Sequence, residues 1–266
     1  MIEIKYGHDV LYKNEYNQLP SFKLGNNESK FLFKGDKLVS PNYAQSDSLI
    51  LHYDFTSLNN NSTNRAVASD LSGNGNDGQL HNFNFTEESG YVDGGLKFDG
   101  VDDYVNFDEI VFDSLDEFTV ELYISEVPDN NGSSYILGDG NKSFSNSTNT
   151  SFQIFKSENA KSISFNRKGM RSSSGGYSVL IDNKLSYSIS VKNKEMKFYL
   201  DGKHLIYGNS IITDDESTSV FNNLGQAYWS SSSGFTKGVV SGVRIYNKSL
   251  SPEEIKYNYE IDKERF

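Results

Sequence analysis

The sequence contains no cysteine among its 266 residues. This absence excludes a disulfide framework, thiolate-bound metal sites and a cysteine nucleophile. It is compatible with folding in a reducing compartment, where disulfides do not persist. A chain of this length buries roughly three quarters of its unfolded surface on folding, so it needs no covalent or metal crosslink.

Positive charge is also scarce. Lysine and arginine number 25 against 36 aspartates and glutamates, which gives a formal net charge of −11. Because nucleic-acid affinity comes largely from lysine and arginine at the phosphates, this balance predicts no nucleic-acid partner, and it disfavours an anionic membrane surface. An acidic surface leaves uncharged ligands such as glycans open.

Long apolar runs are missing as well. No run approaches the ~20 residues that span a bilayer, so no membrane insertion is expected. The segment Met1–Tyr6 lacks the basic region and apolar core of a signal peptide. We therefore expect synthesis in a cytoplasm and no export by an ordinary secretory signal.

Proline is rare, with four residues, whereas aromatic residues make up 14% of the chain. Tyrosine and phenylalanine favour strands, as do the β-branched residues found in the patterned segments. In the stretch Gly94–Val105, Leu96 and Phe98 alternate with charged residues, which is the period of a half-buried strand. Asp99-Gly100 then supplies turn chemistry. This stretch predicts a hairpin around which the other strands pack.

The same alternation predicts strands at 48–55, 79–85, 117–124, 135–138, 152–155, 163–165, 177–180, 187–191 and 239–246, and a second hairpin at 197–206. One helix is predicted from Pro252 toward Glu264, because Ser251 supplies an N-cap and Glu254 completes a capping box. Closely spaced strands separated by turns predict an all-β fold, a two-sheet antiparallel sandwich of about a dozen strands.

Residues 1–46 form a distinct section with short strand patterns of its own. The section is too small to hold an independent core, so we expect it to pack on the main domain or on another protein. The sequence therefore predicts two parts, an N-terminal section at 1–46 and a main domain at 47–266.

Five motifs follow one another along the main domain: Asp70–Gly78, Gly95–Val105, Phe118–Glu121, Phe198–Gly202 and Val243–Ile255. In this order they resemble the laminin G-like, concanavalin A-like jelly-roll family over roughly residues 48–258. The resemblance implies two stacked antiparallel sheets, and binding of glycan or protein rather than catalysis. Members with a short strand-rich N-terminal section look like bacteriophage virion proteins, and the Asn/Ser-rich composition here is similar to theirs.

The glycine-rich loop 70–78 is a candidate metal site. Asp70, Asn74 and Asn76, with loop carbonyls, offer several of the six to eight oxygens that Ca²⁺ prefers, so calcium is the one cofactor that the sequence suggests. The alternative is a turn whose side chains bond their own backbone. Relatives often add a carboxylate from the late strand, where this chain has Ser241 and Gly242, and this departure counts against the site.

The single tryptophan marks a candidate carbohydrate site. Tyr228, Trp229 and Ser231 lie in a serine-rich stretch. Aromatic faces stack on sugar rings, and neighbouring hydroxyls bond sugar hydroxyls. The alternative is that Trp229 fills the core between the sheets.

Glu260, Asp262 and Glu264 have the spacing of the catalytic carboxylates in jelly-roll glycoside hydrolases of the laminarinase type. That chemistry needs a strand, on which alternate carboxylates share one face ~5 Å apart. On a helix, residues two apart point roughly 200° apart, so we interpret this segment as a solvated helix end. The four histidines show no metal or triad spacing. No catalytic residue is predicted, and we expect the protein not to be an enzyme.

A second acidic group, Asp99, Asp102 and Asp103, lies at the predicted turn, where we interpret the carboxylates as caps of strand ends. The sequence as a whole predicts a non-enzymatic bacteriophage structural protein of the tail, neck, fibre or capsid decoration. Residues 1–46 would attach it to other virion proteins, and the lectin-like domain would contact host glycan or a virion partner. Symmetric homo-oligomers are expected by default. A bacterial cell-surface carbohydrate-binding module and a jelly-roll glycoside hydrolase are the alternatives.

Overall fold

The computed structural model of the chain describes most of the main domain and parts of the N-terminal section. The described residues are 3–6, 9–13, 22–24, 27–29, 32–34, 37–40, 43–44, 46–92, 94–113, 116–126, 132–140, 151–157, 160–166, 175–177, 185–205, 210–211, 218–227, 234–263 and 265.

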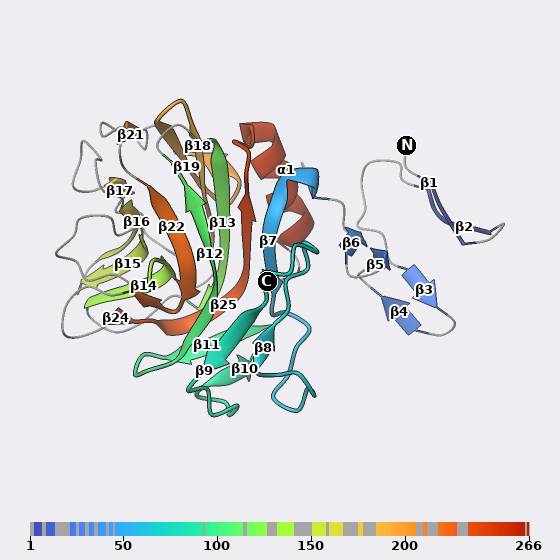
Figure 1. Ribbon diagram of the computed structural model, residues 1–266, viewed down its shortest axis with the longest axis horizontal. Coiled ribbons are helices and arrows are strands. Elements are labelled where there is room, and N and C mark those ends of the chain that lie inside the picture. Colours follow the sequence, from blue (N-terminus) through green and yellow to red (C-terminus); the bar gives the residue numbers. More distant parts are fainter. Residues whose placement is uncertain are drawn as a thin grey trace.

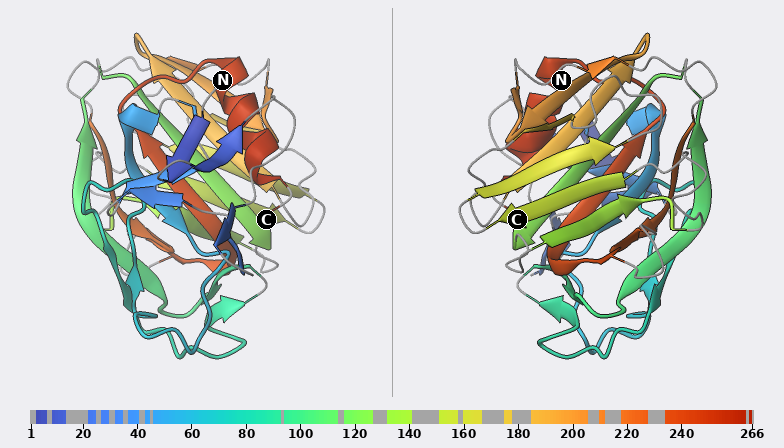
Figure 2. Two further views of the ribbon diagram at one scale, coloured as in Figure 1. Left: turned by 90° about the vertical axis from the view of Figure 1, so that its right-hand side faces the viewer. Right: turned by 90° about the vertical axis from the view of Figure 1, so that its left-hand side faces the viewer.

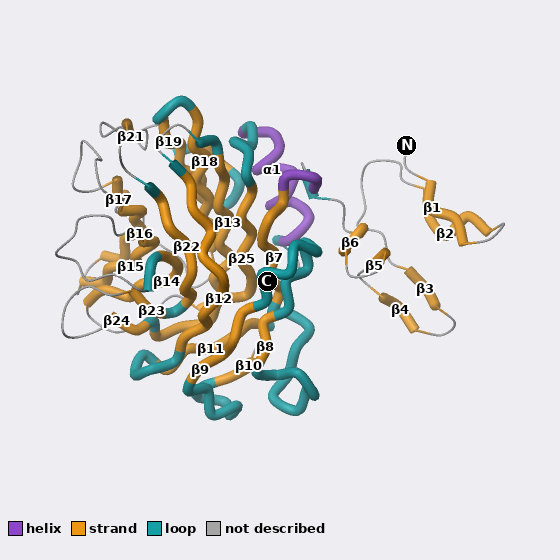
Figure 3. The backbone as a smooth tube through the Cα atoms, in the orientation of Figure 1, coloured by secondary structure: helices purple, strands orange, loops and turns teal. Residues whose placement is uncertain are grey.

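Two antiparallel sheets stack face to face (Figures 1 and 3). In the nine-stranded sheet the strands are, in order, β10 (Gly90–Val92), β11 (Gly95–Asp99), β25 (Lys237–Tyr246), β13 (Phe118–Glu126), β18 (Leu185–Lys192), β19 (Glu195–Leu200) and β20 (Lys203–His204), with β7 (Leu49–Asp54) paired to β25 and β21 (Ser210–Ile211) paired to β19. In the eight-stranded sheet they are β17 (Gly175–Tyr177), β16 (Ala160–Asn166), β15 (Ser151–Ser157), β14 (Gly132–Gly138), β22 (Ser219–Leu224), β12 (Tyr104–Phe112), β9 (Gly78–His81) and β8 (Val67–Ala68). The predicted all-β, two-sheet antiparallel sandwich is confirmed.

Alternating side chains place one face of each strand in the core. In β13, Val120, Leu122 and Ile124 lie between the sheets, whereas Glu121 and Tyr123 lie on the opposite face. Each fully buried aliphatic or aromatic side chain contributes roughly 1.5–3 kcal/mol of transfer free energy, so this face accounts for much of the sandwich's stability.

The stretch Gly94–Val105 differs from its prediction. Its two strands do not pair with each other, because β11 pairs with β10 and β25 in one sheet and β12 pairs with β9 and β22 in the other. The predicted hairpin is wrong: Gly100–Asp103 carries the chain across from one sheet to the other. Leu96, Phe98 and Val105 all lie in the core. A turn motif predicts that the chain reverses direction. Which sheet the next strand joins depends on partner strands that are distant in the sequence.

The second predicted hairpin is confirmed. Strands β19 and β20 pair through the turn Asp201–Gly202, where both residues have positive φ, +49° and +69°. Two consecutive positive φ values match the twist of the flanking strands, which is why Asp-Gly is favoured there.

The predicted helix is α1, Pro252–Asp262. Ser251 Oγ accepts from the backbone N–H of Glu254, and the Glu254 carboxylate accepts from the backbone N–H of Ser251, which completes the capping box. Ile255 packs with Leu49 and Tyr246 against the outer face of the nine-stranded sheet (Figure 2). In the described part of the chain, no helix has the length and hydropathy to cross a membrane.

Among the described residues of the N-terminal section, no strand joins either large sheet. Its described strands pair as three hairpins beside the sandwich (Figure 1): β1 (Glu3–Tyr6) with β2 (Asp9–Lys13), β3 (Phe22–Leu24) with β4 (Asn27–Ser29), and β5 (Leu32–Lys34) with β6 (Lys37–Ser40). The 3-10 turn Ser46–Ser48 leads into β7, and β23 (Gln226–Ala227) pairs with β24 (Gly234–Phe235). The domain boundary at residue 46 stays a prediction.

Candidate functional site

The loop after β8 is organised by the carboxylate of Asp70. One carboxylate oxygen accepts from the backbone N–H groups of His52 and Ser72 at 2.9 and 3.0 Å, and the other accepts from Ser72 Oγ at 2.7 Å and from Asn76 N at 3.1 Å. The side-chain amides of Asn74 and Asn76 donate to backbone carbonyls of β7. The loop thus folds back on β7 through its own polar side chains.

These contacts bear on calcium, which prefers oxygens that are free to coordinate it. Both oxygens of Asp70 already accept two hydrogen bonds each, so this set of donors does not fit the ion without rearrangement. Calcium binding by Asp70, Asn74 and Asn76 stays a prediction. The predicted carbohydrate residues Tyr228, Trp229 and Ser231 lie outside the described residues.

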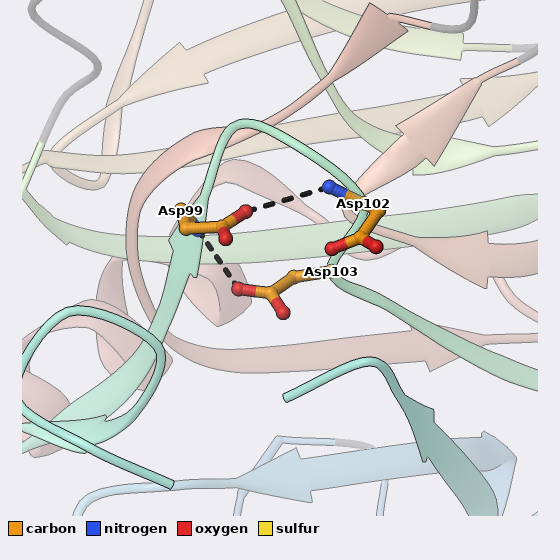
Figure 4. Close-up of side chains that lie close together, drawn as sticks. All are labelled: Asp99, Asp102 and Asp103. Carbon is orange, nitrogen blue, oxygen red and sulfur yellow. Dashed lines mark hydrogen bonds between the residues drawn. The ribbon is translucent and has the colours of Figure 1, made fainter. Parts of the chain in front are cut away.

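The crossover turn between β11 and β12 gathers three carboxyl groups, as Figure 4 shows. One oxygen from each of Asp99, Asp102 and Asp103 lies within 4.8 Å of the others. Asp103 is buried; its carboxylate accepts from the backbone N–H of Asp99 at 2.9 Å and from Ser89 Oγ at 3.0 Å. Asp99 accepts from the backbone N–H of Val101 at 2.7 Å. The predicted capping role fits these bonds, which fix the turn where the chain changes sheets.

Burial raises the pKa of the Asp103 carboxyl from 3.8 to about 6, and the neighbouring charges of Asp99 and Asp102 add to the rise. The two hydrogen bonds from Asp99 N and Ser89 Oγ lower it only in part. Asp103 therefore keeps its proton to a higher pH than an ordinary aspartate does.

This pKa predicts a pH dependence of stability. Because the folded-state pKa lies above the unfolded one, the stabilising contribution of protonated Asp103 is complete below pH 3.8 and is lost as the pH rises through about 6. Asp103→Asn removes the titration. From pH 4 to pH 7 its free energy of unfolding, measured in urea, is expected to gain on the order of 1–2 kcal/mol relative to wild type. Asp108→Asn, an exposed carboxylate on β12, is the control. A constant difference between Asp103→Asn and wild type would disprove the assignment.

A buried ion network lies on the outer face of the nine-stranded sheet, beneath α1. Arg244 of β25 pairs with Glu121 of β13 at 2.8 Å and with Asp262 of α1 at 2.6 Å. Asp262 also pairs with Arg265 at 2.8 Å, and Arg265 pairs with Asp54 of β7. All five side chains are nearly or fully buried.

The network corrects one interpretation of the C-terminal acidic segment. A solvated helix end is wrong for Asp262, which is fully buried, although Glu260 is 48% exposed and pairs with Lys263. The helix itself is confirmed, so these carboxylates do not share a strand face. Burial alone would lower the pKa of Arg244, but Asp262, Tyr123 and Glu121 raise it well above its ordinary value. The sequence feature that could have revealed this buried network is Arg244, a lone arginine inside the otherwise uncharged run Val239–Tyr246.

The network also anchors the segment that leads into the sandwich. The Tyr43 hydroxyl donates to Asp262 at 2.9 Å, and its ring lies 3.9 Å from the Arg244 guanidinium. The same ring meets the buried His52 ring edge-on at 5.3 Å. Burial, and then the charge of Arg244, lower the pKa of His52 to about 3, so this histidine is neutral at physiological pH.

Comparison with known proteins gives a family and a fold. A family model described as the concanavalin A-like lectin/glucanases superfamily matches residues 99–256. No curated protein sequence matches the chain. Trypanosoma rangeli sialidase in complex with sialic acid is similar in structure at 16% identity, with a TM-score of 0.58, over 82% of this chain and 33% of the sialidase chain.

Two further solved structures are similar over comparable parts of the chain. The binding domain of botulinum neurotoxin DC, in complex with rat synaptotagmin II, matches at 16% identity and a TM-score of 0.48, over 82% of this chain and 52% of that one. Domain 4 of AbnA, a GH43 extracellular arabinanase from Geobacillus stearothermophilus, in complex with arabinotriose, matches at 16% identity and a TM-score of 0.45, over 80% and 98%. The chain spans about a third of the sialidase chains, and likeness at this identity shows the fold alone.

The prediction that the protein is not an enzyme is wrong as it stood. It inferred an absence of activity from the absence of a recognised motif, yet several of the solved structures that share the fold are sialidases. The likeness assigns no activity to this chain, and the exclusion of catalysis is withdrawn.

Proposed function

The chain belongs to the concanavalin A-like lectin/glucanases superfamily, and from this membership we propose that it binds carbohydrate as a domain displayed on a bacteriophage virion. The observation that carries the proposal is the family match over residues 99–256, more than half of the chain, on a two-sheet sandwich. The acidic net charge of −11 agrees with a saccharide ligand better than with nucleic acid.

The placement on a virion has two supports. The sequence resembles virion proteins in its composition and in its strand-rich N-terminal section. In addition, the three described N-terminal hairpins pair with neither large sheet, and edge strands of hairpins can pair with a second protein. We propose that residues 1–46 attach the domain to other virion proteins. Detection of the chain by mass spectrometry in purified virions is expected, and its absence there would favour a bacterial cell-surface module instead.

Carbohydrate binding is tested on whole bacterial cells with fluorescently labelled full-length protein. Staining is expected on a subset of strains, and periodate treatment of the cells is expected to abolish it, because periodate cleaves the vicinal diols of sugars. Staining that survives periodate would point to a protein receptor and contradict the proposal. Heat-unfolded protein serves as the control for nonspecific adhesion.

Glycoside hydrolysis is the second candidate. The observation that favours it is the carboxyl group of Asp103, with a pKa of about 6, beside Asp99 and Asp102 with oxygens within 4.8 Å. Carboxyl groups about 5 Å apart, one of them with a raised pKa, suit a retaining mechanism. Release of reducing sugar from bound glycan by wild type, lost in Asp103→Asn, would support this candidate, whereas intact glycan would contradict it.

A further inference from the structure

An aromatic pair lies on the outer face of the eight-stranded sheet, next to the crossover turn. His81 of β9 and Tyr104 of β12 are register partners, and their rings stack with centroids 4.6 Å apart at an interplanar angle of 12°. Since Val105 and Phe107 lie in the core, Tyr104 and Asn106 point to the opposite face. Both rings are half-buried and reach solvent.

The turn beside this pair is held in one conformation. The Asn82 side-chain amide donates to the backbone carbonyl of Asp102 at 2.9 Å, and Asp99 and Asp103 bond within the turn as described above. The Asp102 carboxylate is exposed, and one of its oxygens lies within 4.8 Å of oxygens of Asp99 and Asp103. A backbone that is already held by hydrogen bonds loses little freedom on binding, which favours affinity.

The charge of this surface is mostly negative. Residues 78–85 and 99–112 contain no lysine or arginine, whereas they contain five carboxylates. Lys237 of β25 is the register partner of Asp99, and its side chain lies against Gly100, so it offsets part of this negative charge. Val101 and Val111, at either end of the same stretch, are 68% and 47% exposed. The surface therefore combines aromatic rings, exposed apolar carbons and acceptors of hydrogen bonds, and it repels anions.

We propose that the surface made by His81, Tyr104 and Asp102 binds a neutral or amino sugar and rejects sialylated, uronic and phosphorylated glycans. The sugar ring stacks on the aromatic pair, and Asp102 accepts hydrogen bonds from sugar hydroxyl or ammonium groups. An anionic sugar would bring like charges together at the rim, which costs affinity. The inference rests on the proposed carbohydrate binding and names the surface and ligand class.

The test uses the full-length protein on an array of three sets of oligosaccharides: neutral glucans, mannans and galactans; chitosan oligomers; and sialylated, uronic and phosphorylated glycans. Binding is expected in the first two sets only. Tyr104→Ala and Asp102→Asn are expected to weaken it about tenfold. Tyr257→Ala changes a more exposed tyrosine on α1, behind the other sheet; it is the control and is expected to leave binding unchanged. Thermal melts check the fold of each variant, and Asp102→Asn alters only an exposed side chain.

The outcomes separate this inference from the proposed function. Glycan binding that both variants leave intact, or that is strongest to the acidic set, overturns the inference and leaves the proposed function standing. Binding to no glycan in any set overturns both.

Discussion

Replacing Arg244 by methionine is expected to lower the free energy of unfolding by about 3–5 kcal/mol. Methionine has a similar length and keeps the packing of the stem. However, it leaves the carboxylate of Glu121 buried without its cation, and it leaves Asp262 with Arg265 alone. Removal of one partner from a buried ion pair is costly because the remaining charge has lost both water and its counter-ion.

Urea denaturation at pH 7 measures this effect, and Lys263→Ala is the matched control. Lys263 also pairs with a carboxylate of α1, but both partners are partly exposed, at 38% and 48%. Exposed pairs contribute only about 0–1 kcal/mol. A loss below about 1 kcal/mol for Arg244→Met would show that the network does not hold α1 on the sheet.

Gly225→Ala is expected to destabilise the sandwich by about 3 kcal/mol or more. Gly225 follows β22 with φ of +91°, and an added Cβ would lie 2.2 Å from the ring of Phe98, a fully buried residue of the opposite sheet. The backbone has no room to move away, because Gly225 donates to Ile136 O at 2.7 Å and accepts from Thr236 N at 2.8 Å. Overpacking costs about 1–3 kcal/mol, and a left-handed conformation costs about 1–2 kcal/mol more.

Gly75→Ala separates the two contributions. Gly75 has a similar φ of +78°, yet an added Cβ would meet nothing within 4 Å. The loss of unfolding free energy in Gly75→Ala therefore comes from the left-handed backbone conformation alone and is about 1–2 kcal/mol. Equal losses of unfolding free energy for the two variants, measured in urea, would refute the claim that Gly225 marks a close approach of the sheets.

Much of the fold could be predicted from local pattern. In β13 the alternation of Val120, Leu122 and Ile124 predicted both the strand and its core face, because the period of two is a local property. The capping box at Ser251 predicted the start of α1 for the same reason. The partner of β12 was not predictable in this way: a turn at Gly100 serves a hairpin and a crossover between sheets equally well.

The polar sites also differ in whether local sequence or contacts between distant segments determine them. The self-bonded loop around Asp70 was foreseen as an alternative, since an aspartate reaches backbone groups two residues on. The burial of Asp262 was not foreseen, because it depends on Arg244 and Glu121, which approach only once α1 lies on the sheet. The stacking of His81 on Tyr104 likewise depends on the register of β9 with β12.

Calorimetric titration of the purified full-length protein with the oligosaccharide that binds best on the array is the most direct test of carbohydrate binding. The account predicts saturable binding of a neutral or amino sugar that is weakened about tenfold in Tyr104→Ala and unchanged in Tyr257→Ala. Absence of saturable heat with every glycan class would contradict it.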